Sequence, residues 1–298
     1  MVTSIRALHE LARSATPRTI AVAWPHSEDI LIALDRAAGS GLVRPLLAGQ
    51  RAVIEQLRER LGLDRRPADV IECASAVEAV EVAVRRVAKG EAQMLMKGDV
   101  ATAVFLKGIL NRDWGLRKRP LLSHVAVFEV GRPGRLVLVT DVAMNIAPDV
   151  TEKAQILENA VGLAHKLGIE RPRVAALAAV DTVSGDMPAT VEAAALAKMA
   201  DRGLITGCIV DGPLALDNAL LAEAARQKGI TGPVAGCADI LLVPDIEAGN
   251  VLYKALGLVA RLPVAAVVVG ASAPVVLTSR ADSDEAKFNS IALAAAIA

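Results

Sequence analysis

The stretch TIAVAWPHSEDILIALDRAA, residues 19–38, sets the structural pattern of this chain. Thr19–Pro25 is an apolar run with the length of a buried strand, and a helix pattern follows from about Ser27 to Ala38. Similar strand and helix patterns alternate along most of the chain. Because repeated strand–helix units favour parallel strands covered by helices, we predict an α/β fold with mostly parallel sheets.

One segment in the middle of the chain breaks this alternation. Val125–Val130 and Leu136–Thr140 are two strand patterns joined by Gly131-Arg132-Pro133-Gly134, which is typical of a hairpin. A hairpin in a strand–helix sequence often marks an inserted or interdomain element. We therefore expect two α/β domains with a cleft between them. The first is discontinuous, residues 1–139 plus 270–298, and the second comprises residues 140–269.

Composition limits the classes of function. Hydrophobic residues make up 53% of the chain and aromatic residues only 2%, so Ala, Val, Leu and Ile must build the core, which suits helices packed closely on a parallel sheet. Lys and Arg together number 33, as do Asp and Glu, and the formal net charge is zero. Because binders of nucleic acid or of anionic membranes rely on excess positive charge, we expect neither kind of partner.

The cysteines and the apolar segments indicate a cytoplasmic protein. Cys73, Cys208 and Cys237 are widely separated, so we expect reduced core thiols rather than a disulfide framework or a zinc site. The first residues contain no uninterrupted apolar segment of a secretory signal. No apolar run approaches the roughly 18 residues of a membrane span.

Familiar catalytic motifs are missing. The chain has no P-loop, no G-x-S-x-G elbow and no metal-ligand spacing among its histidines, and Gly39-Ser40-Gly41 precedes a strand, which is the wrong context for a Rossmann site. We expect His124 to be a satisfied core or rim group rather than a base. Asp181 and Asp186 could bind a metal, but solvated loop carboxylates are commoner.

The segment PVVLTSRADS, residues 274–283, contains the strongest local signal for a binding site. An apolar β-branched run ends in Thr278, Ser279 and Arg280, followed by a carboxylate. Ligands of parallel α/β sheets bind at the carboxyl ends of strands, and the planar guanidinium of Arg donates paired hydrogen bonds to an oxyanion. This segment therefore predicts an anion-binding corner, with phosphate as the expected anion.

A second strand end, MKGDVATA, is followed by a glycine turn and a helix start. Unpaired N–H groups there, together with Lys97, would attract a phosphate next to Gly98 and Thr102. The alternative is structural: Asp99 could cap the helix while Lys97 is merely solvated. Lys107, on a later turn of the helix, is by itself typical of a surface lysine.

Three further loops follow predicted strands and contain polar side chains. The first has Asp141 and Asn145, the second Asp211, and the third Asn250. Each could hold a ligand, but local turn chemistry is about as common for Asp and Asn at such positions. Three loops of one type point to a shared cleft, which no single loop would indicate.

Six longer strings resemble one known family. They are spread over the chain from Met94 to Ser290 and are MKGDVATAVFLKGIL, LSHVAVFEV, TDVAMNIAPD, IVDGPLALDNA, ADILLVPDIEAGNVLYK and APVVLTSRADS. The chain resembles the phosphate acetyl/butyryltransferases, most closely the phosphate butyryltransferase branch. The resemblance implies an isopropylmalate-dehydrogenase-like fold of two α/β domains with the active cleft between them, assembled as a homodimer or a larger homo-oligomer.

The resemblance also implies an activity, the reversible conversion of acyl-CoA and phosphate into acyl phosphate and CoA. This chemistry requires no metal or redox cofactor, and CoA is a substrate. Ser279 and Arg280 match the family's Ser-Arg pair, so Arg280 would clamp the phosphoryl oxygens while Ser279 hydrogen-bonds the carbonyl oxygen as charge develops. Lys107 occupies the place where the acetyl branch has an arginine that helps bind the anionic substrates.

The general base departs from the family pattern. In the acetyl-specific enzymes an Asp on the helix after the Ser-Arg pair deprotonates the CoA thiol, and the matching position here is Ala286. Asp284 and Glu285 stand just before it, so either carboxylate could serve through a shifted register, or the base could come from elsewhere. A local basic field could also lower the pKa of the thiol from about 8.5.

Two other classes of function remain open at the level of sequence. An NAD-dependent, metal-assisted dehydrogenase can share the general fold, but it would need an Asp cluster and an adenine-binding loop that are not convincing here. A non-catalytic CoA-binding module would keep the binding loops without turnover. The sequence leaves the acyl chain open among acetyl, butyryl and branched groups, and we expect butyryl or a similar short chain.

Overall fold

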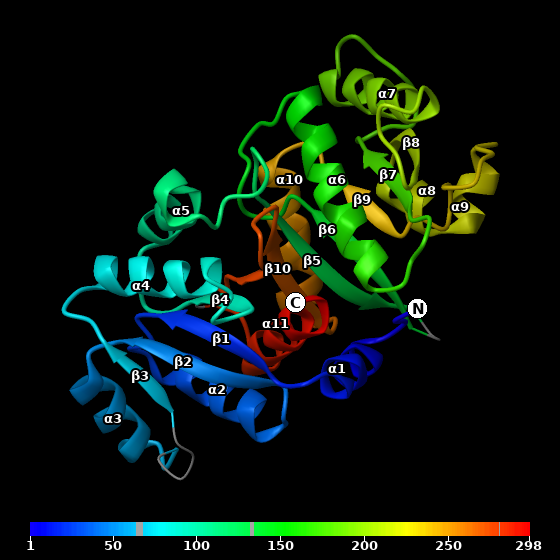
Figure 1. The fold of residues 1–298 in the computed structure, drawn as a ribbon. Helices are drawn as coiled ribbons and strands as arrows, with labels where there is room; N and C mark the ends of the chain where they lie inside the picture. The colour runs from blue at the N-terminus through cyan, green and yellow to red at the C-terminus, as the bar shows by residue number, and fades with distance from the viewer. Residues whose placement is uncertain (64–67, 132–133, 280) are drawn as a thin grey trace. The chain divides into compact units, whose positions relative to one another are not determined.

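The computed structural model describes residues 1–63, 68–131, 134–279 and 281–298. These residues form two compact units (Figure 1). The terminal unit comprises Ile5–Pro120 and Ala265–Ala298, and the central unit comprises Leu121–Val264 together with Met1–Ser4. The expected domain limits placed the hairpin in the first domain, with the second domain starting at residue 140. In the structure both strands of the hairpin belong to the central unit. The limits of independently folding domains stay a prediction.

The sheet of the terminal unit is mainly parallel. Strand β1 (Arg18–Ala23) pairs in parallel with β2 (Val43–Gly49) on one side and with β4 (Met94–Lys97) on the other. Beyond these strands, β3 (Asp69–Glu72) pairs in parallel with β2, and β11 (Val275–Val276) pairs in parallel with β4. The carboxyl ends of β1, β4 and β11 therefore lie next to one another at one edge of the sheet. Strand β10 (Val264–Val269) pairs with β11 in the antiparallel direction.

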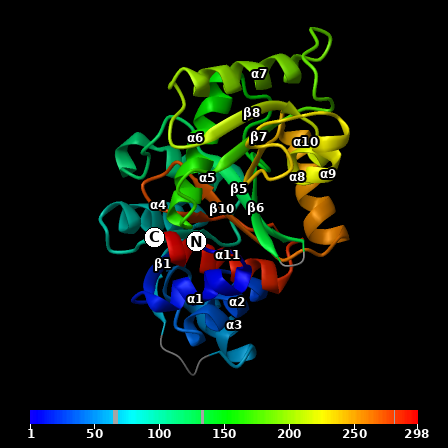
Figure 2. The same ribbon diagram turned by 90° about the vertical axis from the view of Figure 1, so that its right-hand side faces the viewer.

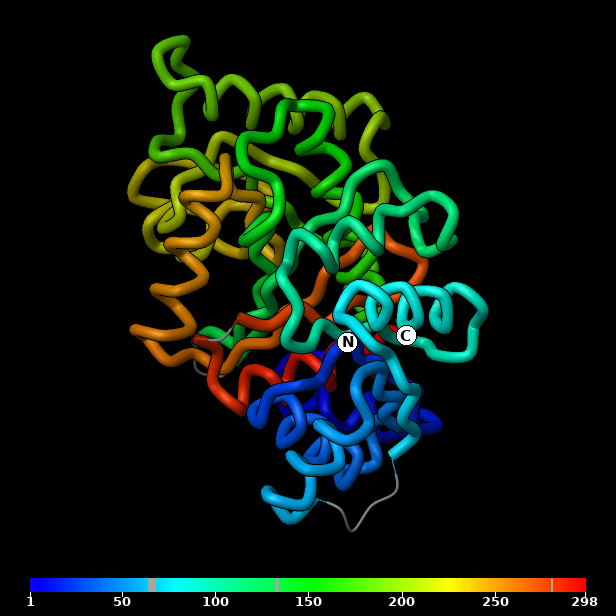
Figure 3. The backbone as a smooth tube through the Cα atoms, turned by 90° about the vertical axis from the view of Figure 1, so that its left-hand side faces the viewer, coloured from blue at the N-terminus to red at the C-terminus, as the bar shows by residue number. Residues whose placement is uncertain are grey.

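Helices cover both faces of this sheet. α4 (Ala76–Ala88) packs on one face, and α2 (Glu28–Gly39) packs on the other (Figures 1 and 3). The buried stripe of α4 contains Ala79, Val80, Ala83, Val84 and Val87, whereas Val77 is 58% exposed. The remaining helical elements of this unit are α1 (Ile5–Ser14), α3 (Arg51–Arg60), α5 (Thr102–Leu110), the 3₁₀ turn η1 (Arg112–Trp114) and α11 (Asp284–Ile297).

The central unit begins with the predicted hairpin and continues with parallel strands. Strands β5 (Ser123–Val130) and β6 (Arg135–Thr140) pair in the antiparallel direction, which confirms the hairpin. Strand β9 (Ile240–Leu242) lies in parallel between β6 and β7 (Arg173–Leu177), and β8 (Ile209–Leu214) forms the edge next to β7. The residues Arg132 and Pro133 of the predicted turn lie outside the described residues.

Helices also cover both faces of the central sheet. α6 (Val150–Lys166) and α7 (Pro188–Asp201) cover one face, while α8, α9 and α10 cover the other (Figure 2). The sequence pattern predicts one helix over 217–228, but the structure has two short helices there, because the backbone of Leu221 is extended. The bounds are α8 Leu216–Leu220, α9 Ala222–Gln227 and α10 Ile246–Lys254, with α10 continuing into the π-helical turn η2, Ala255–Val259.

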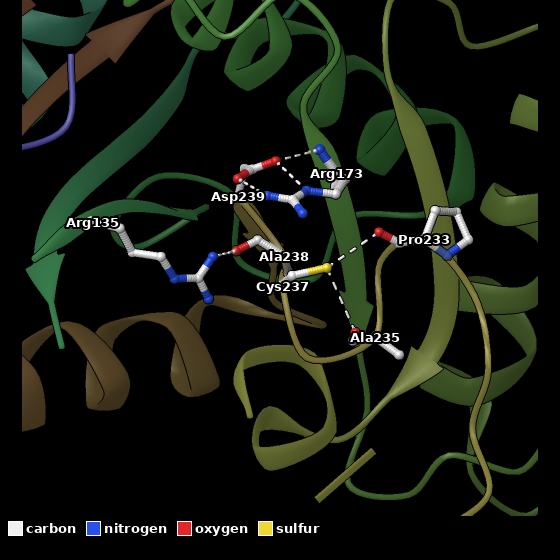
Figure 4. A network of polar contacts seen from close by, with 7 residues as sticks. All are labelled: Arg135, Arg173, Pro233, Ala235, Cys237, Ala238 and Asp239. Carbon is white, nitrogen blue, oxygen red and sulfur yellow. Dashed lines mark hydrogen bonds and ion pairs between the residues drawn. The ribbon is translucent and has the colours of Figure 1, made fainter. Parts of the chain in front are cut away.

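A polar network fixes the amino ends of two central strands (Figure 4). The guanidinium of Arg173, at the start of β7, donates two hydrogen bonds of 2.9 Å to the carboxylate of Asp239, which precedes β9. The guanidinium of Arg135 donates to the carbonyl of Ala238 at 3.0 Å. The Cys237 thiol bonds to nearby carbonyls and is only partly buried, as is Cys208, so the prediction of core thiols holds for Cys73 alone. These contacts lie at the strand ends opposite to the carboxyl ends, so they have a structural role.

The α/β fold with mostly parallel sheets is confirmed. Its core contains the aliphatic side chains that the composition predicts, and the largest fully buried aromatic residues are Phe105 and Phe128. Within the residues that the structure describes, no helix has the length and apolar character that crossing a membrane requires.

Candidate active site

A cavity of about 290 Å³ lies in the terminal unit at the carboxyl ends of β1, β4 and β11. It is the position where parallel α/β sheets bind their ligands. Three chain segments line it, and each follows one of these strands. The lining residues are Ser27, Asp29, Ile30, Lys97, Gly98, Asp99, Thr278 and Ser279. The structure thus brings together four residues that the sequence predicts as a phosphate site, Lys97, Gly98, Thr278 and Ser279.

Gly98 allows the end of β4 to lie against the end of β1. Its N–H donates to the carbonyl of Ala23 at 2.9 Å, and the next N–H, of Asp99, donates to the carbonyl of Trp24 at 2.7 Å. A Cβ atom at position 98 would lie 2.2 Å from that Trp24 oxygen. Only glycine therefore permits this approach, which places the side chain of Lys97 at the cavity wall.

The start of α2 supplies backbone N–H groups and a carboxylate to the cavity. Ser27 is the N-cap residue, but its side chain caps no backbone N–H. Burial alone would raise the pKa of the Asp29 carboxyl, but the Ser27 hydroxyl and the Lys287 ammonium outweigh it and lower that pKa. Asp29 is therefore ionised at neutral pH. Helix starts attract anions in general, so the cavity wall combines the start of α2 with a fixed negative charge.

Ser279 begins a tight turn that leads into α11. Its N–H donates to the carboxylate of Asp282 at 2.7 Å, and the N–H of Asp282 donates to the carbonyl of Ser279 at 3.1 Å. The Ser279 hydroxyl oxygen accepts from the N–H of Ala281 at 3.2 Å. This leaves the hydroxyl hydrogen available as a donor. Arg280, the centre of the predicted anion clamp, lies outside the described residues.

Lys287 connects this turn to the start of α2. Its ammonium donates to the carbonyl of Asp282 at 2.7 Å and lies 3.3 Å from the carboxylate of Asp29, and only 3% of the residue is exposed. The sequence analysis did not select Lys287, Asp29 or Ser27 for the site. One signal was present: Lys287 is a cation in the first turns of the segment DEAKFNSIALAAAI, whose following residues are almost all apolar.

The other predicted residues of the terminal unit do not line the cavity. Thr102 and Lys107 are exposed on α5, which agrees with the alternative of a surface lysine. Asp284 and Glu285 are exposed in the first turn of α11. The carboxylate of Glu285 lies 2.6 Å from the guanidinium of Arg36, on α2.

Asp141 and Asn145 lie in one loop of the central unit, whereas Asn250, which the sequence analysis places in a loop, lies inside α10. Asp141 is 3% exposed, and its carboxylate accepts from the N–H groups of Ala143 at 2.9 Å and Met144 at 3.0 Å, and from the side-chain amide of Asn145. The amide of Asn250 donates to the carbonyl of Val142 at 3.2 Å. Burial raises the pKa of Asp141 against these hydrogen bonds. The polar atoms of Asp141 therefore stabilise this loop, which is the turn chemistry that the sequence left open.

Asp211 does not begin a loop, which corrects the expectation from its DGP sequence. It lies inside β8, opposite Ala175 of β7, and its carboxylate accepts from the N–H of Gly212 at 2.8 Å. The physical reason is the place of β8 at the edge of the sheet. A proline is tolerated on an edge strand, because one side of that strand has no partner and the absent N–H donor leaves no ladder hydrogen bond unmade there. Gly-Pro therefore does not end the strand.

The remaining candidates for a base or a metal site have structural partners or are buried. Asp181 accepts from the side chain of Asn218 at 2.9 Å and lies 3.0 Å from the ammonium of Lys228. His124 is 5% exposed, and neither ring nitrogen has a hydrogen-bond partner among the described residues, so the prediction of a satisfied histidine is wrong. Burial lowers the pKa of His124 to about 4. In the described part of the chain, no three His, Cys, Asp or Glu side chains form a group that could hold a metal ion.

Comparisons with known proteins identify the family of this chain. The family described as phosphate acetyl/butaryl transferase matches residues 72–295. The chain is 46% identical over 298 residues to the phosphate butyryltransferase of Clostridium acetobutylicum, covering 100% of this chain and 99% of that protein. It is 53% identical over 277 residues to the probable phosphate butyryltransferase of Bacillus subtilis, covering 93% and 92%.

Comparison with a solved structure also points to this family. The crystal structure of a branched-chain phosphotransacylase from Enterococcus faecalis V583 matches with a TM-score of 0.82 and 36% identity, covering 94% of this chain and 98% of that one. The family that the sequence strings resemble is thereby confirmed. The chain belongs to the phosphate acetyl/butaryl transferase family.

Proposed function

We propose that this chain catalyses the reversible transfer of a short acyl group, butyryl or one of similar length, between CoA and inorganic phosphate. The observation that supports it most directly is the cavity, which places Ser279 and Thr278 beside Lys97 and the start of α2 in a member of this family. A cation, two hydroxyls and the start of a helix suit a phosphate ion.

The chemistry assigns a role to each of these groups. In the direction from acyl-CoA, a phosphate oxygen attacks the thioester carbonyl carbon, and the carbon–sulfur bond then breaks to release CoA as the thiolate. Negative charge develops on the carbonyl oxygen in between, and the Ser279 hydroxyl donates a hydrogen bond to it. Lys97, Gly98 and Thr278 hold the phosphate. Arg280, next to Ser279 in the chain, clamps the phosphoryl oxygens.

The reverse direction needs a base for the CoA thiol. We propose Asp284 rather than Glu285, because the Glu285 carboxylate is paired with Arg36. Both the thioester and the acyl phosphate are activated acyl donors, so acyl transfer between them does not require a metal or redox cofactor. The remaining predicted contacts, of Thr102, Lys107, Asp141, Asn145, Asp211 and Asn250 with substrate, stay predictions, as do the cytoplasmic location, the homo-oligomer and the cleft between domains.

Phosphate-dependent release of CoA tests the proposal. Purified protein is mixed with butyryl-CoA, with and without inorganic phosphate, and free thiol is followed with a chromogenic disulfide. We expect release only with phosphate, together with a product that hydroxylamine converts to a hydroxamate. A series of acyl-CoA substrates from acetyl to hexanoyl and isobutyryl at saturating phosphate then defines the chain preference. Release that is independent of phosphate with every short acyl-CoA would overturn the proposed function.

A further inference from the structure

Lys287 is a buried cation with two partners. One partner lines the cavity, and the other belongs to the turn that begins with the cavity residue Ser279. One partner, Asp29, lines the cavity from the start of α2. The other, the carbonyl of Asp282, belongs to the turn that begins with Ser279. Lys287 itself lies on α11, which packs against α2 (Figure 2). Three separate segments of the terminal unit therefore meet at one ammonium group.

Burying this ammonium costs desolvation free energy, and its partners have to offset that cost. A buried lysine is tolerated where a carboxylate and hydrogen-bond acceptors surround it. Lys287 has both, a carboxylate at 3.3 Å and a carbonyl at 2.7 Å. Removing either charge would leave the other without compensation beside the cavity.

If Lys287 were removed, the negative charge of Asp29 would remain, and it would affect the binding of an anion such as phosphate. Asp29 lines the same cavity as Lys97 and Ser279, so a phosphate ion there would lie near its carboxylate. Like charges repel strongly in a partly desolvated site. The Lys287 ammonium cancels the charge of Asp29, and it holds the carbonyl of Asp282 at the same time, which fixes the turn on which Ser279 sits.

We propose that Lys287 is a positioning residue for phosphate binding: it neutralises Asp29 in the cavity wall and holds the Ser279–Asp282 turn against the start of α2. This inference rests on the proposed function, because it assigns phosphate to this cavity. It concerns binding of the ion itself, so it can be tested without turnover.

The test is calorimetric titration of the full chain with inorganic phosphate, using wild type, Lys287→Met, Asp29→Asn and the double variant. We expect Lys287→Met to weaken phosphate binding about tenfold or more, because one unopposed carboxylate remains in the wall. The double variant removes both charges but also lacks the hydrogen bond to the Asp282 carbonyl, so its affinity should lie between that of Lys287→Met and that of wild type. Glu28→Gln is the matched control, because Glu28 lies in the same helical turn but outside the cavity lining, and its affinity should match wild type.

Two results would overturn the inference. The first is wild-type affinity in Lys287→Met. The second is a double variant that binds phosphate as weakly as Lys287→Met, which would show that the charge of Asp29 is not what Lys287 offsets. If Lys287→Met does not fold, the Asp29→Asn variant tests the inference by itself. This variant leaves the Lys287 cation unopposed, so it should bind phosphate more tightly than wild type. Equal or weaker binding would contradict the inference.

Kinetics separate positioning from a general loss of structure. With acyl-CoA saturating, Lys287→Met should raise the KM for phosphate about tenfold or more, while the KM for acyl-CoA stays within about threefold. Lys287→Arg keeps the charge and should recover most of the phosphate affinity. A wild-type protein that binds phosphate but transfers no acyl group would refute the proposed function and still leave the titration as the test of Lys287.

Discussion

The carboxylate of Glu285 lies 2.6 Å from the guanidinium of Arg36, and the same guanidinium lies 3.9 Å from the centre of the Phe288 ring. Arg36 is in the last turn of α2, whereas the cavity is at the first turn of that helix. Glu285 is thus held on the surface of the α2–α11 packing, away from Ser27 and Asp29. The structure thus gives a partner to Glu285, one of two neighbouring carboxylates that the sequence could not distinguish.

This relationship leads to a prediction for the general base. Glu285→Gln should keep kcat for CoA acylation by butyryl phosphate within about threefold of wild type. Asp284→Asn should lower it about a hundredfold, which is the size of a lost general base. Steady-state rates of both variants across pH 6 to 9 check this. Equal and small effects in the two variants would remove Asp284 from the mechanism and direct the search to another base.

A second prediction uses two serines of the same turn. Ser279→Ala should lower kcat about a hundredfold, because it removes a donor to the developing oxyanion. Ser283 is the N-cap residue of α11, and its hydroxyl accepts from the N–H of Ala286 at 3.1 Å. Ser283→Ala should therefore destabilise the fold by about 1 kcal/mol with little change in kcat at low temperature. Thermal unfolding and initial rates of both variants give the comparison, and a normal rate in Ser279→Ala would refute its role.

Arg280 gives a third prediction, which comes from its place beside Ser279 in the sequence. Arg280→Ala should lower turnover about a hundredfold or more, and Arg280→Lys should recover only part of the loss, since an ammonium cannot donate two parallel hydrogen bonds. Rates with phosphate as the varied substrate measure both effects. Near-normal rates in Arg280→Ala would exclude this guanidinium from phosphate binding.

A fourth prediction concerns the close approach of Gly98 and Trp24. Gly98→Ala would place a Cβ atom 2.2 Å from the Trp24 carbonyl oxygen, so the end of β4 must shift and the Lys97 side chain must move with it. We expect a lower melting temperature and weaker phosphate binding. Gly162→Ala is the matched control: beyond its chain neighbours and the backbone of its own helix, no atom lies within 4 Å of the added Cβ, and alanine stabilises a helix interior such as that of α6. An unaltered melting temperature and affinity in Gly98→Ala would contradict this account.

The fifth prediction is a pH dependence of stability from His124. Burial lowers the pKa of His124 to about 4 in the folded protein, whereas a histidine in the unfolded chain has its ordinary pKa of 6.5. Above that value both states are neutral and the residue adds no pH dependence. As the pH falls below it, only the unfolded state takes up the proton, so the free energy of unfolding decreases, by about 3 kcal/mol when pH 4 is reached.

Urea unfolding at pH 7.5 and pH 4.5 measures this contribution. His124→Gln should lose about 2 kcal/mol less than wild type between these two conditions, because it has no imidazole to protonate. His165→Gln serves as the control, since its ring is exposed and bonds to the carbonyl of Gly207. The same loss in wild type and His124→Gln would show that other groups account for the acid sensitivity.

Sequence alone located the strand ends that build the site. The alternation that begins at residues 19–38 predicts parallel strands, and the carboxyl ends of such strands meet at one edge. That argument sufficed to select Lys97, Gly98, Thr278 and Ser279, which the structure brings to one cavity. These predictions rest on local patterns, because strand direction and the position of a polar residue after a strand can both be found along the chain.

Only the tertiary structure decided which charged side chains meet. The pair formed by Lys287 and Asp29, the pair formed by Glu285 and Arg36, and the place of Asp211 within an edge strand depend on how α11, α2 and β8 pack. Residues that are remote in the chain come within hydrogen-bond distance through burial of apolar helix faces, and no local pattern records that geometry. The sequence therefore identified two of the three strand ends at the site, and packing added the start of α2 and determined the charge balance inside the cavity.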